Sequence, residues 1–599
     1  MYETKITTKL LSKVNSPQDI KHFSFPKLNE LAEEVRETLI CVCAKNGGHI
    51  GTNLGVVELT IALHYAFDSP KDKLVFDTTH QTYTHKLLTG KREKFDTICT
   101  PKGIPRFSVR SDNVHDCWGA GHASTGLSAA MGMAEARKRN KKQYEVVAIV
   151  GDGAMTGGMC FEAMNNIGYN QTDLLIVLND NKMSISPNVG ALYEYMKRLS
   201  MTSASDKPRR EIGTIFEKLG IRYYGPVDGH DIEGLVQAFN ELKHIRGPKL
   251  LHVLTEKGKG MQYMEKDKAR WHEHAAFDIE TGDPVKPKSP TLEGVAVQAL
   301  IELAEKDDSI IGITAAMPSG TAMAKFGEKF PDRFYDVGIA EEHATTFAAG
   351  LACEGVKPFV CIYSPFLQRA FDQIMHDVSL QDLPVRFMVP KAAITGDGPT
   401  QGGILDLSYL RVIPNTVVMA PKDENELRHM IKTMQLYEKG PISVRYPKGN
   451  INSIPAEPLK EIPIGQAEVL REGKDVALIA IGSMVGDALK ASDQLKGMGI
   501  EAAVVNARFA KPLDEKTIIH ALKTCGKGIT LEENTLVGGF GSAVLELLES
   551  RGLQDIHVTR IGAPDEYIGY DDPKNIKAGY GMNVESIVAR AKEWVARTK

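Results

Sequence analysis

Short apolar runs alternate with helical patterns along almost the whole chain, and this alternation constrains the fold more than any other feature. Val146–Val150 and Leu174–Leu178 are two such runs, and Gly158–Tyr169 between them has the pattern of a crossover helix. Strands and helices that alternate in this way are typical of parallel sheets covered by helices. The sequence therefore predicts an α/β fold with mainly parallel sheets.

The alternation restarts twice, which predicts three consecutive α/β domains within the 599 residues. Their expected bounds are residues 1–277, 291–464 and 465–599, with a linker over 278–290 that is rich in proline and charge. The second domain is expected to contain strands Ile310–Thr314, Phe334–Val337, Phe359–Tyr363 and Val385–Val389 and helices Leu292–Ala304, Thr321–Phe326, Glu342–Ala352 and Phe366–Val378. The third is expected to contain strands Val476–Ile481, Ala502–Asn506, Gly528–Leu531 and His557–Ile561 and helix Gly486–Met498.

Composition excludes several classes of protein and partner. With 42% hydrophobic and 25% charged residues, the chain is neither collagen-like nor a disordered polar tract. The formal charge of −4 gives no basic excess for nucleic acid, and the short apolar runs are far below the roughly 20 residues that span a bilayer. No secretory signal is expected, and eight cysteines without a C-x-x-C pair favour reduced, buried thiols and a cytoplasmic location.

The most informative motif is Gly151-Asp152-Gly153, which directly follows one predicted strand. Asn181 follows the next predicted strand and lies 29 positions after Asp152. Both polar side chains are therefore expected at the carboxyl ends of neighbouring parallel strands, where open α/β sheets bind ligands. Carboxylate and amide oxygens suit Mg²⁺, and a glycine next to a helix N-terminus suits a phosphate. The glycine-aspartate-glycine triplet alone is explained equally well by an ordinary strand–helix turn with an aspartate cap. The second polar segment at this spacing favours a ligand site.

This pattern resembles the thiamine-diphosphate-binding signature. The resemblance extends across essentially the whole chain to the 1-deoxy-D-xylulose-5-phosphate synthases, a family of transketolase-like enzymes. It is carried by Gly48–His64, Gly151–Gly158, Leu178–Leu192, Gly225–Asp231, Ile339–Ala352, Ile362–Asp372, Asp406–Arg411 and Arg445–Asn450. It implies a transketolase-like fold that binds thiamine diphosphate and Mg²⁺.

The resemblance also implies roles for individual residues. The Mg²⁺ ligands would be Asp152, Asn181 and the backbone carbonyl of Met183. The cofactor would be held by His80, Gly121, His122, Ala123, Gly153, Ala154, Asn181, Lys257, Glu341 and Phe366. The catalytic residues would be Glu341, His49, His80 and His272, and the substrate would be bound by Tyr363, Arg369, Lys391, Asp397 and Arg445.

Residue chemistry supports some of these roles better than others. Glu341 follows an expected strand and precedes an expected helix, so a carboxyl group held there against an apolar ring should retain a proton more readily. Glu341 and Glu342 could instead simply complement a helix N-terminus. By pattern alone, Phe366 fits a core position and each histidine fits a structural one. The family's glutamate bonds the aminopyrimidine ring, and this match favours the catalytic interpretation of Glu341.

The activity implied is the decarboxylative condensation of pyruvate with glyceraldehyde 3-phosphate, which gives 1-deoxy-D-xylulose 5-phosphate and CO₂ for isoprenoid precursors. A homodimer with its active site between the first two domains is also implied. The alternatives are a divergent paralogue that transfers a ketol or acyl unit between other sugar phosphates, and a catalytically silent binding or regulatory subunit. Retention of Asp152, Asn181 and Glu341 argues against the silent subunit. A dehydrogenase is disfavoured because Gly151–Gly157 lacks the required glycine spacing.

The sequence departs from the family at positions that would face the substrate. Cys99 stands where the family has an arginine towards the donor's carboxylate, and Gln401 stands where it has a histidine. The other departures are Lys391 for arginine, Met261 for tyrosine and Ala123 for serine. An arginine–carboxylate bond contributes roughly 1.5–3 kcal/mol, so the departures predict altered handling of donor and acceptor.

We therefore expect, from sequence alone, weak use of pyruvate or a preference for a donor without its carboxylate. Cys99→Arg and Gln401→His, singly and together, should raise pyruvate-dependent turnover, because they restore charge and acid–base capacity. Steady-state kinetics with pyruvate and glyceraldehyde 3-phosphate measure this. Efficient use of pyruvate by the unmodified protein would contradict the expectation.

Overall fold

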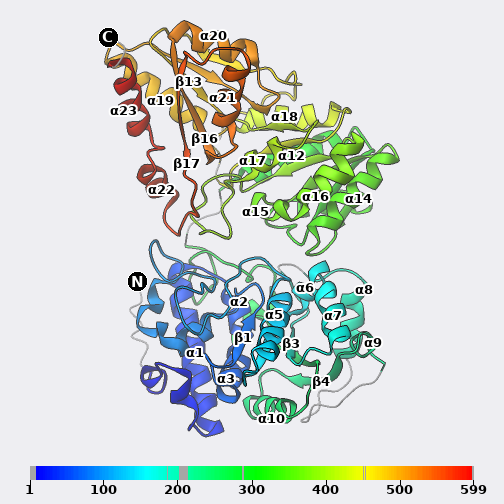
Figure 1. Ribbon diagram of the computed structural model, residues 1–599. Helices are drawn as coiled ribbons and strands as arrows, with labels where there is room; N and C mark the ends of the chain where they lie inside the picture. The colour runs from blue at the N-terminus through cyan, green and yellow to red at the C-terminus, as the bar shows by residue number, and fades with distance from the viewer. Residues whose placement is uncertain are drawn as a thin grey trace. The chain divides into compact units, whose positions relative to one another are not determined.

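The computed structural model describes residues 8–184, 187–200, 213–285, 289–449, 451 and 454–596 (Figure 1). The chain forms two compact units. The first comprises Met1–Lys288 with Gly338–Ala340, and the second comprises Ser289–Val337 with Glu341–Lys599.

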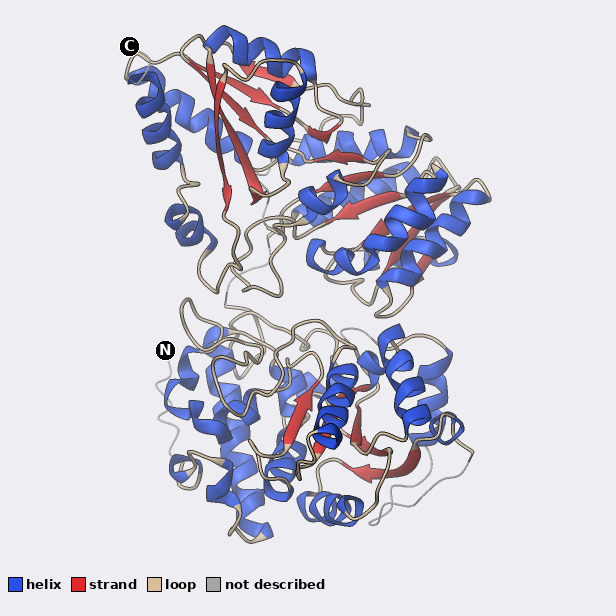
Figure 2. Ribbon diagram, in the orientation of Figure 1, coloured by secondary structure: helices blue, strands red, loops and turns tan. Residues whose placement is uncertain are grey.

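The first unit is built on one sheet of five strands in the order β1-β2-β3-β5-β4, and every neighbouring pair is parallel. Helices cover both faces of this sheet (Figure 2). Alternate residues of β2, such as Val147 and Ala148, enter two different hydrophobic clusters, which explains why the strand is apolar at every position. The strands are β1 (Lys73–Phe76), β2 (Val146–Gly151), β3 (Leu175–Asp180), β4 (Arg222–Asp228) and β5 (Lys249–Leu254).

One face of this sheet packs against α1 (Phe25–Asn46), α3 (Val57–Ala66) and α10 (Ile232–Lys243), and the other packs against α5 (Gly126–Arg139) and α7 (Gly158–Asn170). The two predicted strands and the crossover helix between them are thus confirmed, with bounds shifted by one or two residues. The linker begins as a folded segment of this unit, because Tyr263 Oη donates to Ile279 O and Arg270 donates to Gly282 O. Its residues 286–288 lie outside the described part of the chain.

The second unit contains two sheets. The larger has seven strands in the order β15-β10-β11-β9-β8-β6-β7, and the smaller has five in the order β12-β14-β13-β16-β17. All pairs are parallel except β10 with β15 and β12 with β14. The strands are β6 (Ile310–Thr314), β7 (Phe334–Asp336), β8 (Lys357–Cys361), β9 (Arg386–Val389), β10 (Val417–Met419), β11 (Ile442–Arg445), β12 (Glu468–Arg471), β13 (Val476–Ala480), β14 (Ala502–Asn506), β15 (Phe509–Lys511), β16 (Lys527–Thr535) and β17 (His557–Ala563). The chain forms three sheets in series, which are mainly parallel. The predicted α/β fold class is therefore confirmed.

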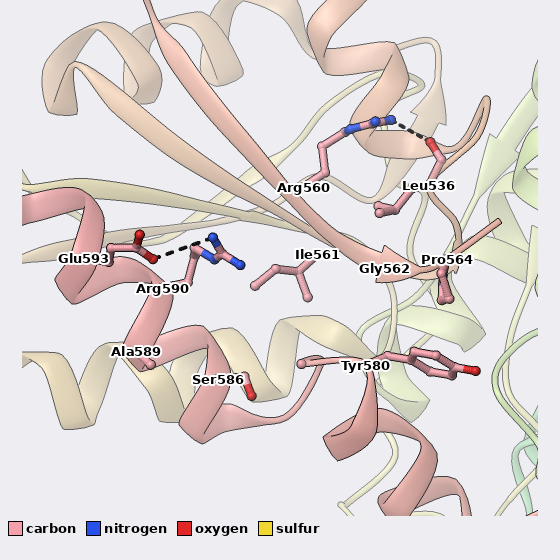
Figure 3. A pocket seen from close by; sticks show the side chains of 11 residues that line it. Leu536, Arg560, Ile561, Gly562, Pro564, Tyr580, Ser586, Ala589, Arg590 and Glu593 are labelled. Carbon is pink, nitrogen blue, oxygen red and sulfur yellow. Dashed lines mark hydrogen bonds and ion pairs between the residues drawn. The ribbon is translucent and has the colours of Figure 1, made fainter. Parts of the chain in front are cut away.

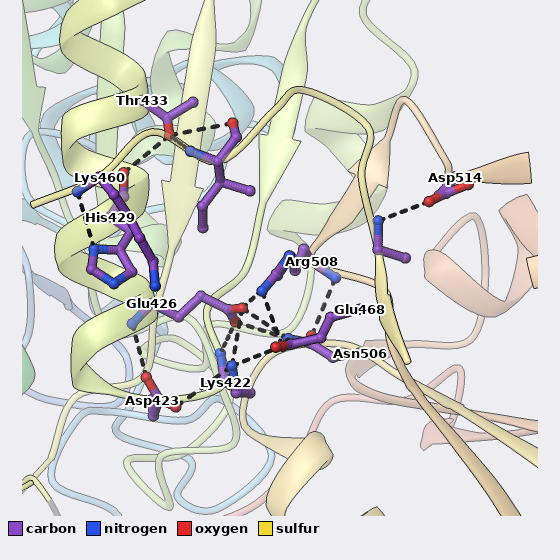
Figure 4. A network of polar contacts seen from close by, with 12 residues as sticks. Lys422, Asp423, Glu426, His429, Thr433, Lys460, Glu468, Asn506, Arg508 and Asp514 are labelled. Carbon is purple, nitrogen blue, oxygen red and sulfur yellow. Dashed lines mark hydrogen bonds and ion pairs between the residues drawn. The ribbon is translucent and has the colours of Figure 1, made fainter. Parts of the chain in front are cut away.

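Two features join the sheets of the second unit. Strand β15 follows residue 465 in sequence, yet it pairs with β10 in the seven-stranded sheet. Beside it, the buried carboxylate of Glu426 on α18 (Glu424–Leu436) accepts hydrogen bonds from Asn506 Nδ2 (2.9 Å) and Arg508 Nε (2.7 Å) (Figure 4). Lys422 Nζ joins the same network, 3.3 Å from Glu426 Oε1 and 2.9 Å from Glu468 Oε2. The expected boundary at 465 is therefore crossed by a strand and by buried charges.

Several predicted elements have their expected bounds, and two helices do not. Leu292–Ala304 is α12, Ile310–Thr314 is β6 and Ala502–Asn506 is β14. The single helix expected over Phe366–Val378 is wrong, because the chain there forms short α, 3₁₀ and π turns, with Ala370 outside helical geometry (φ −95°, ψ 19°). Over so short a segment, α, 3₁₀ and π turns all bury the same apolar residues. The spacing of apolar residues in the sequence therefore does not distinguish them from one continuous helix.

The helix expected from Thr321 also begins later, at Ala324 in α13 (Ala324–Lys329). Ala322 has a left-handed backbone (φ 63°), and Thr321 Oγ1 donates to Met317 O, which competes with helix formation. Four of the eight cysteines are buried, three are half-buried and Cys353 is exposed, so the expectation of buried thiols holds for half of them. Across the described ranges, we find no helix with the length and apolarity needed to cross a bilayer.

Candidate active site

The carboxyl ends of β1, β2 and β3 hold the residues predicted to bind metal and cofactor. Asp152 begins the short helix α6 (Asp152–Met155) directly after β2, and Asn181 follows β3 directly. Because the parallel register pairs Gly151 with Asn179, both side chains lie at the same edge of the sheet. The placement predicted from their spacing is confirmed.

Asp152 is almost fully buried, and its carboxyl group is held by residues that the sequence reasoning did not single out. Asn188 Nδ2 donates to Asp152 Oδ2 (2.8 Å), and the carboxyl of Asp180 lies within hydrogen-bonding distance on another side. Burial and, next, the charge of Asp180 raise the pKa of Asp152 well above its ordinary value. Asp180 itself is fixed by His252 Nε2 at 2.9 Å. A cation at this edge would take the place of the proton that the raised pKa keeps on Asp152.

A turn before α5 is tied to the same edge of the sheet. This turn contains Gly121, His122 and Ala123. Asp77, which follows β1, accepts hydrogen bonds from the backbone N–H of Ser124 and Gly126, both at 2.8 Å. Ser124 Oγ then donates to Ala154 O at 2.8 Å, which links the turn to the segment after Asp152. Asp77 therefore anchors the chain directly after the three residues that the resemblance assigns to the cofactor.

Gly153 lies where another part of the chain approaches very closely. A Cβ added at this position would lie 2.8 Å from Ser184 Cβ and 3.2 Å from Asn188 Oδ1. Any side chain at 153 would therefore push away the segment that carries Asn188, the partner of Asp152. The glycine between Asp152 and Ala154 is required by this close packing.

The three histidines predicted to be catalytic form one cluster. The ring centroids of His49, His80 and His272 are 5.4–5.6 Å apart in each pair, and His80 stacks on His272. Burial, followed by neighbouring positive groups, lowers the pKa of His80 and of His272 well below the ordinary value. Both imidazoles are therefore neutral at physiological pH, and each can accept as well as donate a proton.

Lys257 connects this cluster to the Asp152 edge. Its Nζ donates to Ser184 O (2.8 Å) and lies 3.2 Å from His272 Nδ1. Burial lowers the pKa of Lys257 to about 7, although the charge of Asp152 opposes that shift. The residue is 1% exposed, and lysine side chains are rarely buried to this extent.

In the second unit, Glu341 begins α14 (Glu341–Cys353) and is 5% exposed. Its Oε2 has no hydrogen-bond partner among the described residues, and Arg369 Nη1 lies 3.8 Å from it. Burial raises the pKa of Glu341 to about 7, while Arg369 acts to lower it. A buried carboxyl oxygen without a hydrogen bond is the arrangement expected of a group that awaits a polar ligand.

Four other predicted residues of this unit form one group. Tyr363 and Phe366 stack with ring centroids 5.9 Å apart, and Tyr363 Oη donates to Gly320 O. Lys391 Nζ lies 5.7 Å from the Tyr363 ring centroid and pairs with Asp397 Oδ2 at 2.9 Å. Gln401 accepts from the same ammonium group at 3.4 Å. The structure therefore brings Tyr363, Phe366, Lys391 and Asp397 together.

Arg445, predicted to bind a substrate phosphate, is buried against a carboxylate of the same unit. It is 2% exposed, and its Nε donates to Asp406 Oδ2 at 2.7 Å. Its Nη2 also donates to Glu533 O at 3.0 Å. The guanidinium of Arg445 stabilises the buried carboxylate of Asp406. Lys448, three residues after Arg445 in sequence, is exposed. The sequence reasoning missed this because an arginine in a motif does not reveal a buried carboxylate 39 positions away.

A separate cavity of about 450 Å³ lies in the third sheet and contains none of the predicted site residues. Figure 3 shows its lining, in which Arg560 donates to Leu536 O and Arg590 pairs with Glu593. Within the described part of the chain, no group of three or more His, Cys, Asp or Glu residues could hold a metal ion. A metal at the Asp152 edge would therefore need mixed protein ligands together with oxygens from a bound ligand.

Comparison with known proteins gives the class of the chain. Residues 288–453 match the family model described as transketolase, pyrimidine binding domain, and residues 465–587 match transketolase, C-terminal domain. Together with three parallel-sheet domains and the clustered site, these matches define a transketolase-like transferase.

Residues 11–215 and 205–255 match the model for 1-deoxy-D-xylulose-5-phosphate synthase. Proteins with that name are 47% identical in Thermomicrobium roseum, over 98% of each chain, and 46% identical in Desulfitobacterium hafniense, over 97% of each chain. The one from Brevibacillus brevis is 45% identical over 98% of this chain and 99% of its own. The chain belongs to the 1-deoxy-D-xylulose-5-phosphate synthase family.

The raised pKa of Glu341 gives a testable effect on stability. The folded protein keeps this proton at pH values where the unfolded chain, with a pKa near 4.5, has lost it. The free energy of unfolding therefore falls as the pH rises from about 4.5 to about 7, and the loss is complete above the folded pKa. Glu341→Gln should remove this penalty and stabilise the cofactor-free protein at pH 8 by roughly 3 kcal/mol.

Urea unfolding of both proteins at pH 5 and pH 8 measures the effect. At pH 5 the free energies of unfolding of the unmodified protein and of Glu341→Gln should differ by less than about 1 kcal/mol. Glu342→Gln, which changes the adjacent carboxyl group on the same helix, is the matched control. If Glu341→Gln changed the free energy of unfolding by the same amount at pH 5 and pH 8, the pKa of Glu341 would not be raised in the folded protein.

Proposed function

We propose that this protein condenses pyruvate with glyceraldehyde 3-phosphate to form 1-deoxy-D-xylulose 5-phosphate and CO₂. The observation that carries this proposal is the cluster of His49, His80 and His272 beside the Asp152 edge, in a chain of this synthase family. The reaction needs one site that binds an anionic cofactor with a metal and one set of neutral acid–base groups.

Thiamine diphosphate with Mg²⁺ is the proposed cofactor, and when bound it supplies the electron sink that lets a 2-oxo acid lose CO₂. Asp152, Asn181 and the Met183 carbonyl would hold the metal. Two observations support the fit: the carboxyl groups of Asp152 and Asp180 are buried side by side, and Gly153 leaves no room for a side chain. Lys257, with its lowered pKa, would gain a stable positive charge next to a diphosphate.

Glu341 would act on the pyrimidine ring of the cofactor. With a pKa of about 7, its carboxyl group carries a proton in a large share of molecules at neutral pH. It can therefore donate a hydrogen bond from Oε2 to a ring nitrogen and take the proton back later. Phe366 and Tyr363 provide an apolar surface close to this unit's other substrate residues. The neutral histidines would supply the proton that the aldehyde oxygen needs when a carbon–carbon bond forms there.

The acceptor's phosphate would be bound by Lys391 and Lys448. These two cations follow β9 and β11, which are neighbouring parallel strands paired through Val389 and Arg445. They therefore lie beyond the same carboxyl edge of the seven-stranded sheet, where α/β sheets bind ligands. Arg369 remains a proposed substrate residue through its position beside Glu341. The homodimer, the cytoplasmic location and the boundaries of the three domains stay predictions.

The reaction is tested by incubating the purified protein with thiamine diphosphate, Mg²⁺, pyruvate and glyceraldehyde 3-phosphate. Mass spectrometry should detect the five-carbon deoxyketose phosphate and equimolar CO₂. A parallel incubation replaces pyruvate by a ketose phosphate. Product from the ketose phosphate but not from pyruvate would favour the divergent paralogue, and no product from either donor would favour a silent subunit.

Asp152→Ala should abolish Mg²⁺-dependent binding of thiamine diphosphate, because it removes the only carboxylate among the proposed metal ligands. Isothermal titration calorimetry should show at least a 100-fold weaker affinity, in line with the loss of a metal ligand. Asp228→Asn is the matched control, since it removes an exposed carboxylate at the end of β4 in the same sheet and keeps the proposed ligands. Unchanged cofactor affinity in Asp152→Ala would refute the metal site.

A further inference from the structure

A cation that the family resemblance did not identify lies beside the histidine cluster. The guanidinium of Arg106 forms an ion pair with Glu273 Oε1, and the arginine side chain is only 15% exposed. The other carboxylate oxygen of Glu273 lies 3.9 Å from His49 Nε2. The ring of Phe107, the next residue, lies 5.7 Å from the His49 ring. Arg106 is therefore connected to His49 through two neighbouring contacts.

Cys99 lies next to the same histidine from another side. Tyr83 Oη is 3.5 Å from Cys99 Sγ and accepts from the backbone N–H of His49 at 3.3 Å. Gly48, which precedes His49, would place a Cβ only 3.1 Å from Cys99 Sγ. The position that carries a thiol in this chain is thus adjacent to the catalytic cluster.

The chain between residues 99 and 106 is a tight loop, which explains how both can flank one histidine. Ile104 N donates to Thr97 Oγ1 at 3.2 Å, so the loop closes on itself. A Cβ on Gly103 would lie 1.9 Å from Thr97 O, so no other residue fits at this position without moving the loop. Residues at both ends of the loop are consequently held near His49.

The charges at this place suit an anionic ligand. A thiol at position 99 supplies no positive charge, and His80 and His272 are neutral. The guanidinium of Arg106 is a fixed charge with planar donors that match a carboxylate. Its partner Glu273 has a side chain that is 47% exposed and can turn towards solvent, whereas Arg106 is largely enclosed. A carboxylate in a ligand could therefore replace that of Glu273.

We propose that Arg106 binds the carboxylate of the 2-oxo acid donor at the histidine cluster. This carboxylate would replace that of Glu273 as the ion-pair partner of Arg106. This inference rests on the proposed function, because it requires a 2-oxo acid as donor. It also changes the expectation drawn from Cys99 alone. If Arg106 supplies the missing charge, the unmodified protein uses pyruvate well, and Cys99→Arg adds little to it.

Steady-state kinetics of the cofactor-loaded enzyme test this role. Arg106→Gln should raise the KM for pyruvate by about 10- to 100-fold, the loss expected for one charge-assisted hydrogen-bonding pair. The KM for glyceraldehyde 3-phosphate and the affinity for thiamine diphosphate should stay within twofold of the unmodified protein. Arg106→Lys, which keeps the charge and loses the planar donors, should give an intermediate KM for pyruvate.

Arg110→Gln is the matched control, since it removes an exposed arginine four residues further along the chain and should leave every constant unchanged. Cys99→Arg should lower the KM for pyruvate by at least fivefold in the Arg106→Gln protein and by less than twofold in the unmodified protein. Thermal unfolding of each variant establishes that it is folded.

The outcomes separate the two proposals. An unmodified protein that does not turn over pyruvate contradicts the proposed function. An unmodified protein that uses pyruvate, with the same KM in Arg106→Gln, contradicts the role of Arg106 alone. An equal rise in KM for donor and acceptor would show that Arg106 maintains the shape of the site and does not select the carboxylate.

Discussion

The parallel register between β2 and β3 is the constraint on which the proposed cofactor site depends. By pairing Gly151 with Asn179, it brings Asp152 and Asp180 to one sheet edge and buries both. The surrounding contacts hold that arrangement: Asn188 bonds Asp152, His252 bonds Asp180, and Asp77 fixes the turn that reaches Ala154 through Ser124. Burial and the charge of Asp180 raise the pKa of Asp152, so the two carboxyl groups lie side by side with a proton kept on Asp152. The proposed Mg²⁺ would supply a positive charge at this edge in place of that proton.

Burial moves two ionisable groups of the proposed site towards neutrality from opposite directions. It raises the pKa of Glu341 to about 7 and lowers that of Lys257 to about 7. In water the first group would be an anion and the second a cation at neutral pH. Each can therefore change its protonation state when a charged ligand arrives. The same desolvation keeps His80 and His272 uncharged, so their rings remain available as proton acceptors.

The sequence identified what depends on local order and missed what depends on distant contacts. Asp152 and Asn181 could be placed because a strand, a crossover helix and a second strand fix their separation. Asp77 could not, because its partners Ser124 and Gly126 lie nearly 50 positions away. The pairing of Arg445 with Asp406 could not be predicted for the same reason, since burial against Asp406 leaves no mark in the motif around Arg445. The broken segment that follows Tyr363 shows a further limit: apolar spacing alone does not distinguish α, 3₁₀ and π turns.

Strand β15 has a consequence for how this chain can be divided. Sequence periodicity places a module boundary near residue 465, yet β15 completes the seven-stranded sheet from beyond that point. A fragment ending there would expose the backbone edge of β10, and an open strand edge favours association with other chains. It would also leave Glu426 enclosed without Asn506 and Arg508. The two C-terminal sheets therefore form one structural unit. A gene fission or domain graft that separates the chain at residue 465 would leave a fragment prone to aggregation.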